Sequence, residues 1–317
     1  MIGEHNKMKY ILTLWCFIVL IPIYGQQSSL FSHYYWNEQY YNPAYVGSKE
    51  MLHIQAIERL QWLGMEGAPK TFNFSAHSPL NKDNIALGVN FYNDKIGALS
   101  TNGFTTQYAY RLKFKEAKYT LSLGLQAGVE FRNLQSSKLT TDDGMPDPID
   151  PAGFEKSWLP IVGAGAYFYG ENFSVGLGVP QLLPKSTFKS EKWGIKPVFQ
   201  YLISGAYQWN LRDNFRLLPT TTYRIIQAEP DQAEFNLNGI LYDRAILGMG
   251  VRTDKSTIFM AQFIQPIGKN KLNIGYAYDL SWKPLRTTNS GSHEIMISFD
   301  MQTRKQPNII YKSPRYF

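Results

Sequence analysis

Apolar and polar side chains alternate with a period of two along most of this chain. Between residues 119 and 132 the odd positions read Tyr, Leu, Leu, Leu, Ala, Val, Phe, and the even positions read Thr, Ser, Gly, Gln, Gly, Glu, Arg. The same alternation recurs over residues 272–280 and 294–301. Successive side chains of a strand point to opposite faces, so each stretch predicts an amphipathic β-strand and argues against a helix.

Extending this pattern along the chain predicts about 14 antiparallel strands. An even number of amphipathic strands of this length is typical of a transmembrane up-and-down outer-membrane β-barrel, an all-β fold. The expected strands cover residues 52–62, 70–79, 84–93, 103–114, 117–132, 157–169, 172–179, 197–209, 213–226, 233–242, 245–253, 256–265, 270–281 and 292–302.

The connections between these strands alternate in length. Short links are expected at 81–84, 115–116, 170–171, 210–212, 243–244 and 266–269, and long ones at 133–156, 180–196 and 281–291. Bacterial barrels have short periplasmic turns and longer outer loops, so both termini are expected on the periplasmic side. One outer link, near residues 254–255, is short and departs from the rule.

The first 25 residues resemble a secretory signal peptide. Lys7 and Lys9 precede an apolar stretch of about 11 residues, which is too short for a membrane-spanning helix of roughly 20. Gly25 is a suitable small residue at the cleavage point. Residues 26–317 are therefore expected to form a single barrel with short periplasmic N- and C-terminal segments, in which Asn42-Pro43 is a turn that stops an incoming strand.

Composition agrees with an outer-membrane barrel and excludes several other classes. Aromatic residues make up 15% of the chain, as expected for the two aromatic girdles of a barrel, although mean hydropathy is only -0.29. The net charge of +7 is scattered along the chain, so no nucleic-acid partner is expected. The single cysteine, Cys16, lies in the signal segment, which leaves the exported chain without thiol chemistry.

Charged side chains occupy positions that the alternation points toward the barrel interior. They could line a charged channel or a binding lumen, or they could fill the interior as ion pairs that only stabilise the fold, which is the commoner case. The residues are Arg59, Arg111, Arg132, Arg216, Arg224, Arg252, Glu130, Asp279, Glu294 and Asp300.

No catalytic set emerges, so neither an enzyme nor a cofactor is expected. His33, His53, His77 and His293 are scattered, and no Gly-x-Ser-x-Gly elbow is present. The acidic loop 141–151 gathers four carboxylates that could bind calcium, but it lacks EF-hand spacing, and such loops are usually just solvated. These candidate ligands are Asp142, Asp143, Asp147 and Asp150.

Five segments together resemble the PorP/SprF family of the Bacteroidota type IX secretion and gliding machinery. They are YYNPAYVGS at 40–48, RLQWLGMEGAPKTFNFSAHSPL at 59–80, NDKIGALSTNGFTTQYAYRLKF at 93–114, LSLGLQAGVEF at 121–131 and GSHEIMISFD at 291–300.

The resemblance implies a non-enzymatic barrel that works with a secreted gliding or adhesin-type surface protein. Such a barrel would aid the export of that protein or hold its type IX C-terminal domain at the cell surface. A link to the periplasmic ring and other components of the secretion apparatus is an alternative. A passive porin or transport channel is the alternative from another class. Outer-membrane lipid is an expected partner of the barrel in either case.

Candidate partner-binding residues lie near the expected outer ends of the strands. Exposed apolar anchors there would suit docking, although Gly, Pro and Asn in these loops are also what turn geometry demands in any barrel. The candidates are Trp62, Met65, Glu66, Pro69, Asn93, Asp94 and Trp158.

Overall fold

The computed structural model describes residues 31–80, 84–114, 118–135, 155–183, 199–227, 230–282 and 289–302. Within these ranges, no helix is long and apolar enough to cross a membrane. The expected signal segment, residues 1–25, and the C-terminal tail lie outside the described residues.

Within the described residues, fifteen antiparallel strand segments form one continuous sheet. They are β1 (Leu52–Leu60), β2 (Lys70–Pro79), β3 (Ile85–Ile96), β4 (Leu99–Phe114), β5 (Tyr119–Leu134), β6 (Glu155–Tyr169), β7 (Phe173–Val179), β8 (Gln200–Tyr207), β9 (Trp209–Arg212), β10 (Phe215–Ile226), β11 (Gln232–Leu241), β12 (Ala245–Arg252), β13 (Ser256–Ile267), β14 (Asn270–Ser281) and β15 (Ser292–Met301).

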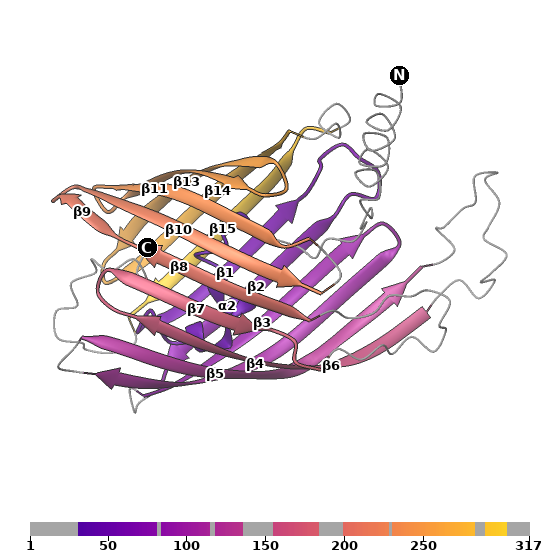
Figure 1. Ribbon diagram of the computed structural model, residues 1–317, viewed down its shortest axis with the longest axis horizontal. Helices are drawn as coiled ribbons and strands as arrows, with labels where there is room; N and C mark the ends of the chain where they lie inside the picture. The colour runs from indigo at the N-terminus through magenta and orange to yellow at the C-terminus, as the bar shows by residue number, and fades with distance from the viewer. Residues whose placement is uncertain are drawn as a thin grey trace, which may run out of the picture.

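The sheet closes on itself, because β1 pairs with β15 as well as with β2. Segments β8 and β9 both pair with β10 and are separated only by Gln208, so they act as one interrupted strand. The result is a closed barrel of 14 antiparallel strands, as the alternation predicts (Figure 1).

Side-chain exposure follows the alternation. In β5, Leu125 faces outward with 61% of its surface exposed, whereas its neighbour Gln126 faces the lumen with 6% exposed. The wall therefore has an apolar outer surface and a polar inner one, as a strand between lipid and lumen requires.

The barrel has two ends. The "terminal end" is the one where β1 begins and β15 finishes, and the "loop end" is the opposite one.

Two connections differ from the expectation. Strands β3 and β4 continue until Ile96 pairs with Leu99, so the expected outer loop after residue 93 shrinks to a two-residue turn in which Gly97 adopts a φ of 55°. The expected tight link at 210–212 is wrong as well. These residues belong to β9, and Asp213 and Asn214 make the turn.

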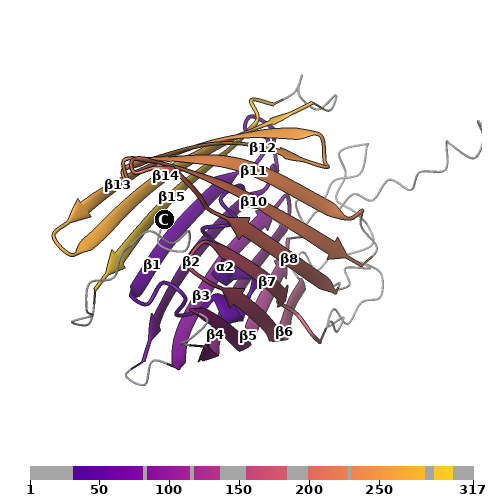
Figure 2. The same cartoon turned by 60° about the vertical axis from the view of Figure 1, so that its left-hand side comes forward.

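Residues 31–51, called the plug below, lie inside the barrel (Figure 2). They contain the short helix α2 (Glu38–Tyr41) and the 3-10 helix η1 (Pro43–Tyr45), and all but Tyr40 and Glu50 are buried. The expected periplasmic segment before the first strand is therefore wrong for these residues. Asn42-Pro43 does not stop a strand either; its Asn side chain caps η1 by accepting a hydrogen bond from Ala44 N.

Candidate functional site: the plugged lumen and the loop end

The start of the plug is clamped to carboxylates on the lumen wall. Glu294 of β15 accepts hydrogen bonds from the backbone N of Ser32 (2.7 Å) and of His33 (2.8 Å), and lies 2.8 Å from His33 Nδ1. Ser32 Oγ also donates to Asp279 of β14 at 2.5 Å. A buried carboxylate needs several donors to offset the loss of water, and the plug supplies them here.

Two arginines connect these carboxylates into one buried network. Arg59 donates to Asp279 (2.7 Å), Glu294 (3.2 Å) and Ser32 Oγ (2.7 Å). Arg252 donates to Asp279 (3.1 Å) and to Glu234 (2.6 Å). All of these wall residues lie close to the loop end of their strands, so the network joins β1, β11, β12, β14 and β15 around residues 32–33.

The end of the plug is held near the terminal end of the barrel. Arg111 donates to the carbonyl of Gly47 at 2.6 Å, and the backbone N of Gly47 donates to His77 Nδ1 at 3.1 Å. Lys49 lies 3.7 Å from the carboxylate of Asp300, which also contacts a histidine of β1. Because its two ends contact opposite ends of the strands, the plug extends through the length of the lumen.

Glycines on the wall let the middle of the plug approach the strand backbone. A Cβ atom at Gly124 would lie 2.2 Å from Ala44 N, and one at Gly178 would lie 2.4 Å from the carbonyl oxygen of Tyr41. A Cβ at Gly165 would meet the Asn42 side chain at 2.1 Å. No real Cβ fits at such distances, so these wall positions accept the plug only as glycine.

Helix α2 adds polar contacts to this close packing. Glu38 accepts a hydrogen bond from Ser204 of β8, and burial raises the pKa of its carboxyl to about 7. Gln39 donates to Gln107 at 2.8 Å and to the carbonyls of Ala76 (3.2 Å) and Val89 (3.1 Å).

The remaining predicted lumen residues face inward but lie outside the buried network of Arg59 and Arg252. Glu130 and Arg132 pair with each other at 2.6 Å, and Glu130 also accepts from Tyr92. Arg224 donates to Gln232 at 2.5 Å. Arg216 pairs with Asp243 in the β11–β12 turn.

The β1–β2 loop, residues 61–69, forms an ordered platform at the loop end. Leu63 N donates to the carbonyl of Gly291 at 2.8 Å, and Ser290 N donates to the carbonyl of Leu63 at 2.9 Å, which joins the platform to the β14–β15 connection. On its other side, Gly97 N donates to Gly67 O at 2.9 Å. Trp62 has a φ of 50°, unusual for a residue with a side chain.

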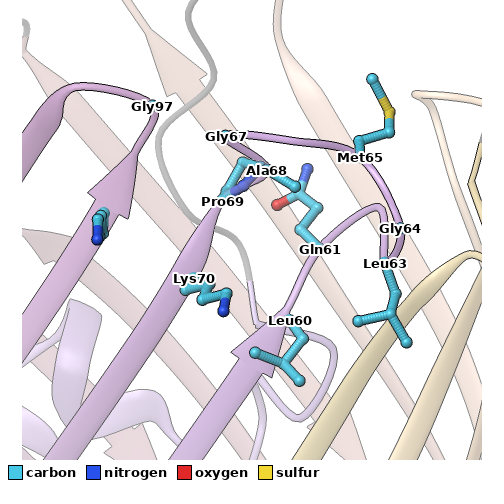
Figure 3. Close-up of a pocket in the computed structure, with 11 residues that line it drawn as sticks. Leu60, Gln61, Leu63, Gly64, Met65, Gly67, Ala68, Pro69, Lys70 and Gly97 are labelled. Carbon is cyan, nitrogen blue, oxygen red and sulfur yellow. The ribbon is translucent and has the colours of Figure 1, made fainter. Parts of the chain in front are cut away.

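A pocket of about 320 Å³ opens beside this platform (Figure 3). It is lined by the loop itself, including Met65 and Pro69, and by Leu60, Lys70 and Lys95 at the ends of β1, β2 and β3.

The structure brings together only some of the predicted partner-binding residues. Trp62, Met65, Glu66 and Pro69 all belong to the platform. Two others lie within β3: Asn93 donates to Asn102 of β4 at 2.8 Å, and Asp94 accepts from Thr71 of β2 at 2.6 Å.

Trp158 stands apart from the platform. It lies in β6, faces outward and packs on Phe131 of β5, with ring centroids 5.0 Å apart. Its position suits an aromatic girdle at the membrane interface.

The candidate calcium ligands Asp142, Asp143, Asp147 and Asp150 lie outside the described residues. Among the residues that are described, no group of three or more His, Cys, Asp or Glu side chains could hold a metal ion.

The strand pattern in the sequence did not predict the plug. A signal was present in the concentration of aromatic residues between positions 31 and 45, which is dense but has no period of two. The wall glycines, at inward positions of otherwise regular strands, were a second signal.

A closed antiparallel barrel with an apolar outer surface and a polar interior is an outer-membrane β-barrel, and comparison with known structures agrees. The toluene transporter TbuX of Ralstonia pickettii is 12% identical, with a TM-score of 0.51 over 83% of this chain and 92% of that one. A Pseudomonas aeruginosa FadL homologue is 10% identical, with a TM-score of 0.44 over 82% and 91%. At 12% identity the likeness to TbuX concerns the fold alone.

The particular family follows from the sequence comparison. The family of type IX secretion system membrane proteins named PorP/SprF matches residues 23–299, nearly the whole chain. The chain belongs to this family and is an outer-membrane component of type IX secretion. None of the curated proteins compared with the chain matches it.

Proposed function

We propose that this barrel is a non-enzymatic docking protein that helps to export or anchor a secreted gliding or adhesin-type surface protein through the C-terminal domain of that protein. The observation that carries the proposal is the plug, which occupies the lumen and contacts the wall near both barrel ends. A barrel filled in this way acts through its surface, so recognition of a protein suits it better than passage of solutes.

The platform supports docking at the loop end, which we expect to face the cell exterior. Leu63 is 42% exposed although hydrogen bonds on both of its backbone groups fix the loop. An apolar side chain on a preorganised loop can bind a partner without an additional cost of ordering the chain. Trp62, Met65 and Glu66 lie on the same loop and are the proposed contact residues.

The proposal is tested by isolating the barrel with its partner. Purification in mild detergent should bring down one specific surface protein. Deletion of the barrel should remove that protein from the cell surface and leave other type IX substrates in place. Loss of every type IX substrate would instead assign the barrel to the core apparatus. If nothing co-purifies and nothing is lost from the surface, docking is wrong.

A further inference from the structure

Two lysines stand directly opposite each other on the outer face of the wall at the loop end. Lys70, the first residue of β2, is the register partner of Lys95 near the end of β3. The alternation of both strands points these side chains away from the lumen, and both are exposed. Like charges in directly opposed positions of a sheet repel each other and destabilise the pair.

Neither lysine has a counter-charge in the part of the chain that the structure describes. No carboxylate there lies within ion-pair distance of Lys70 or Lys95, although Lys113 and Lys118, for example, both have acidic partners. Glu58 is on the same outer face, but it is the register partner of Phe72 and not of a lysine. Two adjacent unpaired cations indicate an anion supplied from outside the chain.

Both lysines line the pocket of about 320 Å³ beside the platform. Figure 3 shows Leu60 and Lys70 at the ends of neighbouring strands below the loop, with Gly67 and Gly97 closing the upper edge. Neither glycine adds a side chain to that edge, and Leu60 adds an apolar wall. The pocket thus combines positive charge with an apolar side.

The outer surface below the lysines is apolar. Two residues further from the loop end, the outer face carries the register pair Phe72 and Asn93. Four residues further from the loop end, it carries the register pair Phe74 and Phe91. Both of these phenylalanines are exposed on the outer wall, where a barrel faces acyl chains. Cations directly above such a surface match an amphiphile with a negative head and apolar tails.

We propose that Lys70, Lys95 and the adjoining pocket bind the phosphorylated head group of a membrane lipid in the leaflet at the loop end. Basic pockets on membrane proteins recognise anionic head groups in this way, and lysine side chains reach from the apolar zone to the interface. The lipid would lie against the flank of the platform and so hold residues 61–69 at a fixed height above the membrane. The inference is independent of docking, because it concerns the outer wall and not the exposed top of the loop.

The experiment uses the full chain purified in non-ionic detergent and titrated with lipid A, a phosphorylated glycolipid, with bound lipid counted by native mass spectrometry. We expect one tightly retained lipid A and weaker retention of phosphatidylcholine. Two lysines near a membrane surface contribute about 1 kcal/mol each, so Lys70→Gln with Lys95→Gln should weaken lipid A binding about 30-fold.

The matched control is Lys156→Gln with Lys255→Gln, which removes the same charge from two other exposed lysines near the loop end. This variant should retain lipid A within about twofold.

Equal losses in both double variants, or equal retention of phosphatidylcholine, would overturn the proposal. Full competition by millimolar inorganic phosphate would reduce the site to a simple anion site. If Lys70→Gln with Lys95→Gln keeps the lipid but loses a co-purifying protein, the lysines serve that protein and the lipid proposal is wrong.

Discussion

Arg59 shows how single residues connect the wall of this barrel to its interior. Its guanidinium is buried and contacts Asp279, Glu294 and the plug residue Ser32. A buried charge is tolerated only when its partners replace water, and a buried pair that loses one partner leaves the other charge uncompensated. The contribution of Arg59 to the stability of the barrel is therefore best measured by replacing this residue.

Replacing Arg59 with Gln should destabilise the barrel by about 3 kcal/mol or more, because Glu294 and Asp279 lose a buried cation. The measurement is the temperature at which the compact, heat-modifiable band on a gel is lost. Arg244→Gln, at an exposed position in the β11–β12 turn, is the control and should change that temperature little. Similar changes in that temperature for both variants would show that the buried Arg59 contributes no more to stability than an exposed arginine does.

Replacing Trp62 tests whether the platform binds the secreted partner. Trp62→Ala should weaken capture of the secreted partner by about tenfold or more while the heat-modifiable band is retained, because anchors of this type dominate protein interfaces. Co-purification yield and band stability are measured on the same preparation. Trp158→Ala is the control, since Trp158 is on the outer wall and away from the platform. If barrel assembly fails as much as capture does, Trp62 is only a structural residue.

At the scale of elements, the strands could be predicted and the plug could not. Strands such as β2 and β14 begin and end where the alternation predicts, because every second side chain must suit either lipid or lumen. Residues 31–51 obey no such rule. They are buried on all sides by the wall, and an irregular segment with contacts in every direction leaves no periodic trace in the sequence.

The wall glycines give a direct test of how the plug is held. Gly124→Ala places a methyl group against the backbone at residue 44 and should shift the plug, at a cost of about 1–3 kcal/mol. The readout is maleimide labelling of Cys introduced at buried Ser48, in a chain where Cys16 is replaced by Ser. Labelling should be faster with Gly124→Ala than without it.

The control for this test is Gly205→Ala on the outer face of β8, where the new Cβ would meet only a Thr221 methyl at 3.5 Å. That variant should leave the labelling rate unchanged. Unchanged labelling in Gly124→Ala as well would show that close packing at Gly124 does not hold the plug.

Glu38 predicts a pH dependence of plug retention. The pKa of its carboxyl is raised from 4.5 to about 7 by burial, so the buried plug binds a proton that a released plug gives up. Retention should be strongest below about pH 4.5, weaken as pH rises toward 7 and level off above it, a total change of about 3 kcal/mol.

Glu38→Gln should remove this dependence, since an amide does not titrate. The measurement is the ratio of Ser48→Cys labelling rates with and without Glu38→Gln across this pH range, which cancels the titration of the thiol itself. A ratio that stays constant from pH 5 to pH 8 would contradict the role of Glu38.

At the scale of the whole molecule, the alternation predicts the closed barrel, and the five family-like segments predict its family. Neither predicts the state of its lumen. Barrels of about 14 strands lie between small ones filled by their own side chains and large ones with an aqueous channel. Strand number alone therefore left a channel and a filled interior equally open. Inward charges of the wall have partners in Ser32, Gly47 and Lys49, which come from a segment that no strand pattern describes.

The filled lumen predicts that the purified full chain conducts no steady ionic current in a planar bilayer. Removing residues 31–47 takes away the contacts with Glu294, Asp279 and Arg111 and should leave a charged, water-filled channel with stable ohmic conductance.

Heat-modifiable migration must first show that the shortened chain still closes into a barrel. If it does not, the full chain carrying Gly124→Ala and Gly178→Ala provides the test, because displacement of the plug should then give intermittent openings. Steady conductance by the unaltered chain, equal to that of the shortened one, would show that the plug does not block the lumen and would favour a porin over a docking barrel.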